Sequence, residues 1–179
     1  MAITPVPNLV DLDGPARERA VPVVRDGFEG IYRWHAKRTL REIERVRAAQ
    51  AASGEVVGVS MLERLVPEVG YVYYVAVLSS HRRHGIAARL LDDALAWFRA
   101  EGVRVVYAAA EEENVASIGL FRSRGFRVVE RDEAGYREGG LGAWGLRSRM
   151  RIVHGELLLG LRLAPEPAVP AARGVTRLS

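Results

Sequence analysis

The sequence contains no cysteine in its 179 residues. This absence excludes disulfide bonds, thiolate metal sites and cysteine nucleophiles together. Histidine is scarce as well. His35, His81, His84 and His154 are not spaced with carboxylates in a ligand pattern, so we expect no zinc site. The chain must carry its chemistry on other residue types.

Long hydrophobic runs are also missing. Apolar-rich stretches such as residues 103–110 and 157–159 fall far short of the roughly 20 residues that span a bilayer. The first residues, MAITPVPNLVDLDG, lack the basic start and apolar segment of a secretory signal. We therefore expect no membrane segment and a cytoplasmic location.

Lysine is almost absent: among the 26 basic residues, Lys37 is the one lysine and the others are arginines. With 22 acidic residues they leave a net charge of +4, which favours anionic ligands in general. Because the arginines are scattered among acidic residues rather than gathered in one stripe, a nucleic-acid interface ranks last among the hypotheses.

What the sequence does contain is the balance of a globular protein, with 49% hydrophobic and 27% charged residues. Its length suits one domain. Prolines and glycine loosen both ends of the chain. We expect an extended tail over residues 1–14, a single domain over 15–164 and a Pro/Ala-rich tail over 165–179.

Hydrophobic periodicity divides the domain into helices and strands. It predicts two short helices within residues 15–43, interrupted near Pro22 and at 27–30, a helix at 85–100 and another that starts at Asn114. Strands are predicted at 46–51, 56–65, 71–78, 103–110 and 126–130, and a last one within 155–163. Residues 71–110 form a βαβ unit with two parallel strands. Too many glycines lie within 139–145 to predict a helix there.

The segment HRRHGIAARLL, residues 81–91, joins a buried strand to the helix that starts at Gly85. The first-turn amides of such a helix have no intrahelical acceptor, and the helix dipole adds partial positive charge there. Gly85 lets ligand oxygens approach the backbone, while Arg82 and Arg83 add charge. The segment is interpreted either as a pyrophosphate site or as a solvated basic turn.

Two motifs in this region resemble the signature of the GNAT superfamily of acyl-CoA N-acyltransferases. The first is a V-x-V-like strand end followed by Arg/Gln-x-x-Gly-x-Gly/Ala, found here from Val75 to Ala87. The second is Asn-x-x-Ala/Ser-x-x-Leu-Tyr/Phe-x-x-x-Gly-Phe, found from Asn114 to Phe126. The match covers roughly residues 46–130. This resemblance implies an α/β (α+β) three-layer fold, in which helices flank a mixed, splayed central sheet.

The same resemblance implies acetyl-CoA as cosubstrate, bound between the strands at 71–78 and 103–110. One strand backbone would pair with the pantetheine arm, and the amides from Arg83 to Ala88 would hold the pyrophosphate. Asn114 would contact the cofactor near its reactive end, although a helix cap also explains this residue. The residues that the resemblance assigns to the cofactor are Val75, Ala76, Val77, Arg82, Arg83, His84, Gly85, Ile86, Ala87, Ala88, Asn114 and Phe121.

Phe121 departs from the family pattern. Many members carry a tyrosine there as the acid that protonates the departing thiolate, and phenylalanine has no proton to give. The acid is then Tyr73, Tyr74 or Tyr107, or water, or catalysis is lost; each of these tyrosines also fits a packing role. Since a general acid contributes about 10²–10⁴-fold, catalysis stays the favoured hypothesis.

For the base that takes a proton from the acceptor amine, the candidate is Glu111, in the acidic run EEE that follows the strand at 103–110. Such a run is also typical of a solvated loop. Glu63 and Glu68 are further candidates, and these carboxylates would favour a cationic acceptor. The helical segment at 31–43 falls where the family shapes its acceptor pocket. Its candidate lining residues are Tyr32, Trp34 and His35.

We therefore expect an acyl-CoA-dependent N-acyltransferase, most simply an N-acetyltransferase that acts on a small amine or a protein amino group. A homodimer is one option for its assembly. The alternative is a CoA-binding sensor or regulatory module without catalysis. The two differ in turnover, because both bind acetyl-CoA but the enzyme alone releases CoA when an amine is present. No motif identifies the acceptor.

Overall fold

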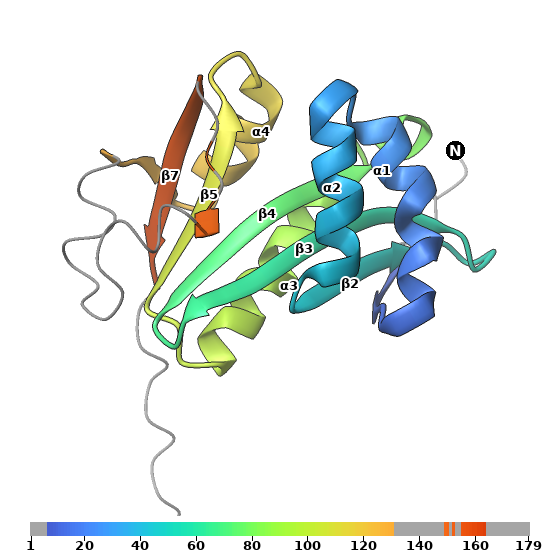
Figure 1. Cartoon of the computed structure of the whole chain (residues 1–179), viewed down its shortest axis with the longest axis horizontal. Coiled ribbons are helices and arrows are strands. Elements are labelled where there is room, and N and C mark those ends of the chain that lie inside the picture. Colours follow the sequence, from blue (N-terminus) through green and yellow to red (C-terminus); the bar gives the residue numbers. More distant parts are fainter. Residues whose placement is uncertain (1–6, 131–148, 151, 153–154, 164–179) are drawn as a thin grey trace, which may run out of the picture.

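Figure 1 shows the fold, taken from a computed structural model that describes residues 7–130, 149–150, 152 and 155–163. Over these residues the strands form one mixed sheet in the order β1-β2-β3-β4-β5-β7-β6. The strands are β1 (Asn8–Asp11), β2 (Arg45–Gln50), β3 (Val56–Val66), β4 (Val69–Val77), β5 (Val105–Glu111), β6 (Arg127–Val128) and β7 (Glu156–Arg162). The helices are α1 (Val21–Gly27), α2 (Gly30–Glu42), α3 (Ile86–Ala100) and α4 (Val115–Arg122), with 3₁₀ turns at Gly14–Ala20 and Ser79–His81.

The predicted elements within the described residues are confirmed, as is the mixed α/β class. Strand β1 was not predicted, and it pairs antiparallel with β2 inside the stretch that the sequence analysis assigned to an N-terminal tail. Its four residues show no clear alternation of apolar and polar side chains, because it is a half-exposed edge strand. The glycine-rich stretch at 139–145 and the tail at 165–179 lie outside the described residues.

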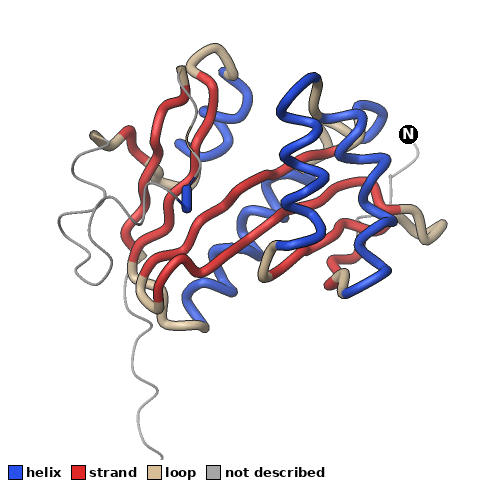
Figure 2. Tube along the Cα trace, viewed as in Figure 1, coloured by secondary structure: helices blue, strands red, loops and turns tan. Residues whose placement is uncertain are grey.

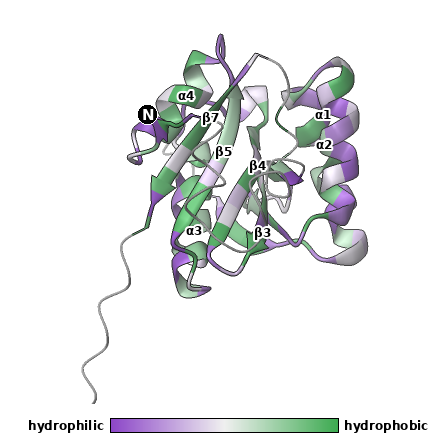
Figure 3. Ribbon diagram, turned by 60° about the vertical axis from the view of Figure 1, so that its left-hand side comes forward, coloured by the Kyte–Doolittle hydropathy of each residue, from purple (hydrophilic) through white to green (hydrophobic). Residues whose placement is uncertain are grey.

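The layers follow from the βαβ unit that the sequence predicted. β4 and β5 are parallel and connected through α3, while the other neighbouring pairs are antiparallel. Figure 2 shows α1 and α2 on one face of the sheet and α3 on the other. In Figure 3 hydrophobic colour covers much of the strands and hydrophilic colour much of α2, as expected when a sheet is buried between two helical layers.

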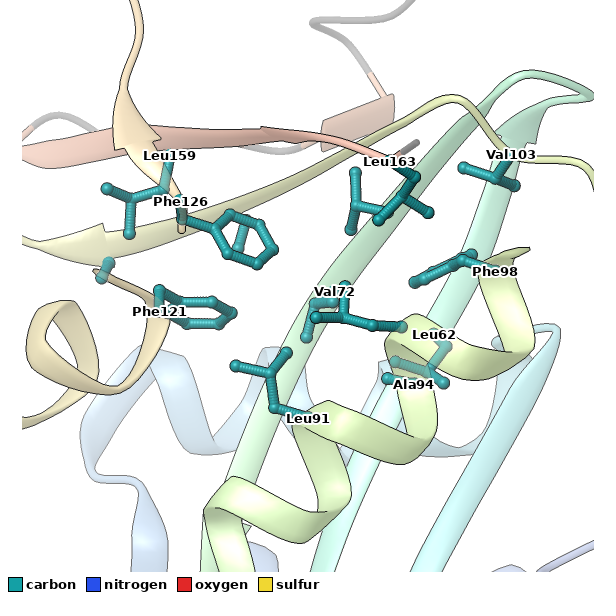
Figure 4. Close-up of a cluster of buried hydrophobic side chains, with 14 of the residues drawn as sticks. Leu62, Val72, Leu91, Ala94, Phe98, Val103, Phe121, Phe126, Leu159 and Leu163 are labelled. Atoms are coloured by element: carbon teal, nitrogen blue, oxygen red, sulfur yellow. The ribbon is translucent and has the colours of Figure 1, made fainter. Parts of the chain in front are cut away.

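The largest core cluster lies between α3 and the sheet. Leu91, Ala94 and Phe98 project from α3 onto Val72 of β4, and the rings of α4 and its following turn close the cluster at one end (Figure 4). Gly70 makes this packing possible, because a Cβ there would lie 2.5 Å from the Phe98 ring. In the part of the chain that is described, no helix has the length and apolar character needed to cross a bilayer.

A bulge at Tyr73 opens the sheet between its two parallel strands. Met61 and Leu62 of β3 pair with Tyr74 and Val72, which leaves Tyr73 as an extra residue in β4. The pairing of β4 with β5 ends at this place, at Val72 opposite Ala108. Since a bulge bends its strand, β4 turns away from β5 while it stays paired with β3, and Figure 1 shows the two strands diverging.

Candidate functional site

The opening between β4 and β5 leads to a cavity of about 420 Å³ on the side of the sheet where α2 lies. This volume suits a small-molecule site. β4 and β5 form its floor, α2 and the segment before it form one wall, and the start of α4 forms another. The described lining residues are Gly27, Phe28, Glu29, Tyr32, His35, Thr39, Tyr71, Val72, Tyr73, Tyr74, Val75, Ala109, Ala110, Glu111, Asn114, Ser117, Phe121, Met150 and Glu156.

Tyrosines make up much of the cavity surface. The bulge turns Tyr73 and Tyr74 to the same face of the sheet, where Tyr71 also lies, and Tyr32 comes from α2. The rings of Tyr71 and Tyr73 meet edge to face at 4.6 Å between centroids. Tyr74 packs in the same manner on Phe28, at 4.9 Å. These contacts hold the aromatic walls in place.

Two carboxylates give the cavity negative charge at the ends of β5 and β7. Glu111 lies directly opposite Glu156 in the antiparallel pair, so both side chains leave the same face of the sheet. Burial, with the charges of Glu156 and Glu111 and a hydrogen bond to Glu111, raises the pKa of Tyr32 to about 12. Burial, with the charge of Glu156 next, also raises the pKa of Tyr71 well above its usual value. Both phenols therefore keep their protons at neutral pH.

Tyr73 has a defined hydrogen bond. Its hydroxyl donates to the backbone carbonyl of Arg149, whose guanidinium pairs with Glu63 and donates to the carbonyl of Leu65. Glu63, on β3, is therefore paired with the Arg149 guanidinium, and it is not among the described residues that line the cavity. Glu68 lies in the turn before β4, and its carbonyl accepts from the amides of residues 104 and 105.

Among the predicted catalytic residues, Tyr107 lies outside the cavity. It pairs with Tyr71 where β4 and β5 are still joined, and its buried ring packs against Gly160 of β7. Ala108, the next residue of β5, is still paired with Val72, so Tyr107 belongs to the closed part of the sheet and the opening begins at Ala109. Tyr73 and Glu111 do line the cavity, as do the acceptor-pocket candidates Tyr32 and His35, whereas Trp34 is 58% exposed outside it.

The turn between β4 and α3 holds a second cluster of predicted residues. Arg83 and Gly85 both have positive φ, of 64° and 74°, and the space where a Gly85 Cβ would stand is open. Within the described chain, no hydrogen-bond acceptor is found for the backbone amides of residues 83–88, and the first amide bond into the helix comes from Arg89. This row of amides at a helix start, with an arginine beside it, fits a pyrophosphate.

Arg82 is held by neighbouring groups. Its Nε donates to the Val77 carbonyl at 3.1 Å, and its guanidinium lies 3.6 Å from Asp26 at the end of α1. Asp26 also accepts from the backbone amide of Ser79 at 2.6 Å and from its hydroxyl at 3.1 Å. The carbonyl of Val77, one of the three residues expected to pair with a pantetheine arm, therefore already has a partner.

Asn114 and Phe121 place α4 beside the opening. The Asn114 side chain accepts from the Ser117 amide at 3.0 Å, so it caps the helix, and it also lines the cavity. Phe121 also lines the cavity; it is only 4% exposed, and its ring packs on that of Phe126 with 5.1 Å between centroids. Figure 4 shows both rings between α4 and the sheet.

The sequence analysis missed several residues of these two regions. Glu156 was seen only as part of a last strand, and its position opposite Glu111 depends on a strand register that no local pattern reveals. Glu29, Tyr71 and Asp26 likewise come near the site only through packing. The one available signal was the acidic run that follows the strand at 103–110, which pointed to Glu111.

Comparison with known proteins shows the family to which this fold belongs. Residues 21–126 match the model of the acetyltransferase (GNAT) family. The chain belongs to the GNAT acetyltransferase family. Proteins of this GNAT family use CoA or acetyl-CoA. Over 87 residues the chain is 34% identical to the L-methionine sulfoximine/L-methionine sulfone acetyltransferase of Pseudomonas aeruginosa, which covers 46% of this chain and 51% of that protein. The chain therefore spans about half the length of this relative.

Solved GNAT structures share the fold. GCN5 of Tetrahymena superimposes with a TM-score of 0.69 at 13% identity, over 90% of this chain and 99% of that one. A Bacillus subtilis acetyltransferase in complex with CoA gives a TM-score of 0.51 at 19% identity, over 67% of this chain and 77% of that one. At these identities the likeness shows the GNAT fold alone.

Proposed function

We propose that this chain is an N-acetyltransferase that moves the acetyl group of acetyl-CoA directly to an amine. One observation carries the proposal: the free edge of β4 continues into the turn at residues 83–88, whose amides have no acceptor within the described chain. A free strand edge suits an extended amide-containing arm, and the amides at a helix start suit a pyrophosphate. Val75 belongs both to this edge and to the cavity, so the two surfaces are continuous.

The cofactor residues would divide between these surfaces. The backbone of Val75 and Ala76 would pair with the pantetheine arm, with Val77 contributing less because Arg82 already binds its carbonyl. The amides from Arg83 to Ala88 would hold the pyrophosphate, with the charges of the two arginines beside it. Asn114 and Phe121 would border the reactive end, since both line the cavity.

The cavity side chains would handle the protons. Bound acetyl-CoA supplies an acetyl thioester, whose sulfur leaves readily. Glu111 would accept a proton from the ammonium group of the acceptor, after which the amine nitrogen forms a bond to the acetyl carbon and the carbon–sulfur bond breaks. Tyr73 or Tyr74 would donate a proton to the departing sulfur, in place of the hydroxyl that Phe121 lacks, and would regain one when the nitrogen of the new amide loses its second proton. Holding the reactants together supplies much of the remaining acceleration.

The first test is calorimetric titration of acetyl-CoA into the wild type and a Gly85→Glu variant. A glutamate at this position puts negative charge and bulk into the amide cradle, so we expect affinity to fall at least ~100-fold. Gly102→Glu is the matched control, because Gly102 has nearly the same φ, 76°, and equally open space at the far end of α3. Equal loss in both variants, or no binding by the wild type, would contradict the proposal.

A second candidate function is a CoA-binding sensor without catalysis, favoured by the buried phenylalanine at position 121. The two functions separate in an assay of CoA release with a panel of amines. Turnover that depends on amine supports the transferase. Tight acetyl-CoA binding without amine-dependent release supports the sensor.

A further inference from the structure

Aromatic rings line the cavity on several sides. Two come from the helical wall, Phe28 in the segment before α2 and Tyr32 in the first turn of that helix, and three come from β4. Phe121 adds a sixth ring from α4. Aromatic residues make up only 7% of the whole chain, so the cavity is strongly enriched in them. A ligand that enters it meets the flat faces and edges of these rings.

The bulge in β4 increases the ring surface on this face of the sheet. In a regular strand Tyr73 and Tyr74 would point to opposite faces, but the extra residue turns both toward the cavity. Each then meets another ring edge to face. Tyr73 meets Tyr71 at 4.6 Å between centroids, and Tyr74 meets Phe28 at 4.9 Å. Two edge-to-face pairs therefore follow each other along β4.

The backbone holds Phe28 in place on both sides of its ring. Its amide donates to the Val24 carbonyl at 3.2 Å, and its carbonyl accepts from Arg33 Nε at 2.7 Å. The ring also packs against the core cluster beneath α1 and α2. A ring that is fixed before the ligand arrives loses little conformational entropy when the ligand packs on it. Phe28 is therefore suited to select the shape of a ligand.

Several of these rings are only half-buried, namely Phe28, Tyr32, Tyr73 and Tyr74. Because each of them lines the cavity, a ligand there can cover part of the ring surface that remains exposed. Covering apolar surface gains free energy in proportion to the area removed from water. An aromatic ligand gains more than a saturated one of the same size, because its ring can meet the protein rings edge to face or offset.

We propose, on the basis of the transferase function above, that the acceptor is an arylalkylamine, with its aromatic ring joined to the amino group through a short chain. Phe28 and Tyr74 would select the ring, and the amino group would reach Glu111, which lines the same cavity. A short aliphatic amine leaves the ring surfaces in water. A saturated ring covers them without the edge-to-face geometry that an aromatic ring allows.

Matched acceptors test this inference. We would measure kcat/KM for CoA release with 3-phenylpropylamine, 3-cyclohexylpropylamine and propylamine, compared at equal concentrations of the neutral amine. The cyclohexyl compound has the same length as the phenyl compound and is bulkier, so burial of apolar area alone would not favour the phenyl compound. We expect the phenyl compound to exceed the cyclohexyl compound by at least ~5-fold and propylamine by at least ~10-fold. Equal or better use of either non-aromatic amine overturns the inference.

Variants of Phe28 show whether this ring causes the preference. Phe28→Leu keeps an apolar side chain without the ring, so the phenyl-to-cyclohexyl ratio of kcat/KM should fall to ~2 or less. Phe28→Tyr keeps the ring and should keep the ratio. Trp97→Leu is the control, because it removes a ring from α3, on the other face of the sheet, and should leave the ratio unchanged. Melting curves check that each variant is folded. A ratio that stays at the wild-type value in folded Phe28→Leu overturns the assignment to Phe28.

Calorimetry separates this inference from the function beneath it. If the wild type does not bind acetyl-CoA, or binds it and acetylates no amine, the transferase proposal fails. The same three amines are then titrated into the protein, with and without CoA. Tighter binding of 3-phenylpropylamine than of the other two supports an aromatic ligand for this cavity. No preference among the three, or tighter binding of a non-aromatic amine, overturns it.

Discussion

The turn at residues 83–88 and the cavity beside β4 and β5 are built on opposite principles. The turn is basic, its residues 83–85 are exposed, and it offers backbone amides from consecutive residues. The cavity is acidic and partly enclosed, and it offers side chains from three helices or their flanking segments and three strands. A site made of backbone tolerates most side-chain changes that keep its conformation, whereas a site made of side chains changes with each of them. Cofactor binding and acceptor choice are therefore expected to respond to different substitutions.

Substitution of Asp26 is the strongest test of this separation, because Asp26 contacts Ser79 and Arg82 next to the turn and does not line the cavity. Asp26→Asn weakens the hydrogen bonds to Ser79 and the attraction to Arg82, so the turn should lose order and the Kd for acetyl-CoA should rise ~10-fold. The relative kcat/KM values for different amines should stay the same, because Asp26 does not line the cavity.

Calorimetry with acetyl-CoA and a panel of amines measures both properties. Asp13→Asn is the matched control, since Asp13 is exposed and makes no side-chain cap hydrogen bond. If Asp26→Asn changes amine preference as strongly as cofactor affinity, the two regions are not separate.

Phe121→Tyr tests the cavity side of the comparison and has a smaller expected effect. It adds a hydroxyl at the cavity position where the resemblance to the family implies a tyrosine. Because Tyr73 and Tyr74 already line the same cavity, we expect kcat to change less than ~3-fold. Steady-state CoA release gives the value, and a melting curve reports whether the packing on Phe126 survives. An increase of ~100-fold would mean that neither tyrosine serves as the acid.

Tyr32→Phe gives the smallest expected effect, in the response of stability to alkaline pH. The pKa of Tyr32 is raised to about 12 in the folded chain, so between pH 10 and 12 the unfolded chain loses this proton first. Stability is fully present below pH 10 and falls as the pH rises toward 12. Removing the phenol should reduce that fall by less than about 1 kcal/mol, because the side chain is partly exposed.

Urea unfolding midpoints of the wild type and Tyr32→Phe at pH 8, 9 and 11 measure this difference. The midpoints should differ equally at pH 8 and 9, and the variant should gain on the wild type at pH 11. A constant difference across all three values would show that folding does not raise the pKa of this phenol.

Local patterns were sufficient for most of the fold. The period of α3 and the mainly apolar residues of β4 and β5 are each visible in short windows, and Gly85 marks the helix start. Strand β1 was not predicted because an edge strand shows little alternation of apolar and polar residues. The bulge at Tyr73 was not predicted for a different reason. An extra residue in one strand is defined only by its pairing with a neighbouring strand, which here is β3.

The candidate site likewise contains residues that local sequence predicted and residues that only strand pairing brought together. The turn at 83–88 was predicted as a pyrophosphate site because such a site consists of consecutive residues. Glu111 was predicted as the base because it follows a recognisable strand, and Tyr73 as a candidate acid because it lies on one. Tyr107, two residues before the first cavity-lining residue of β5 at Ala109, was predicted as well, but the position at which β4 and β5 separate leaves it in the closed part of the sheet. Glu156 lies far along the chain from Glu111, so only the pairing of β5 with β7 brings them together.

By itself, therefore, the sequence determined the order of helices and strands, the basic turn before α3 and the family to which the chain belongs, because each of these depends on residues that are close together in the chain. The tertiary structure alone decided where the sheet opens, which tyrosines face the opening and that Glu156 stands opposite Glu111. These features arise from strand register and bulging, which set contacts between residues far apart in the chain and have no signature in any one segment.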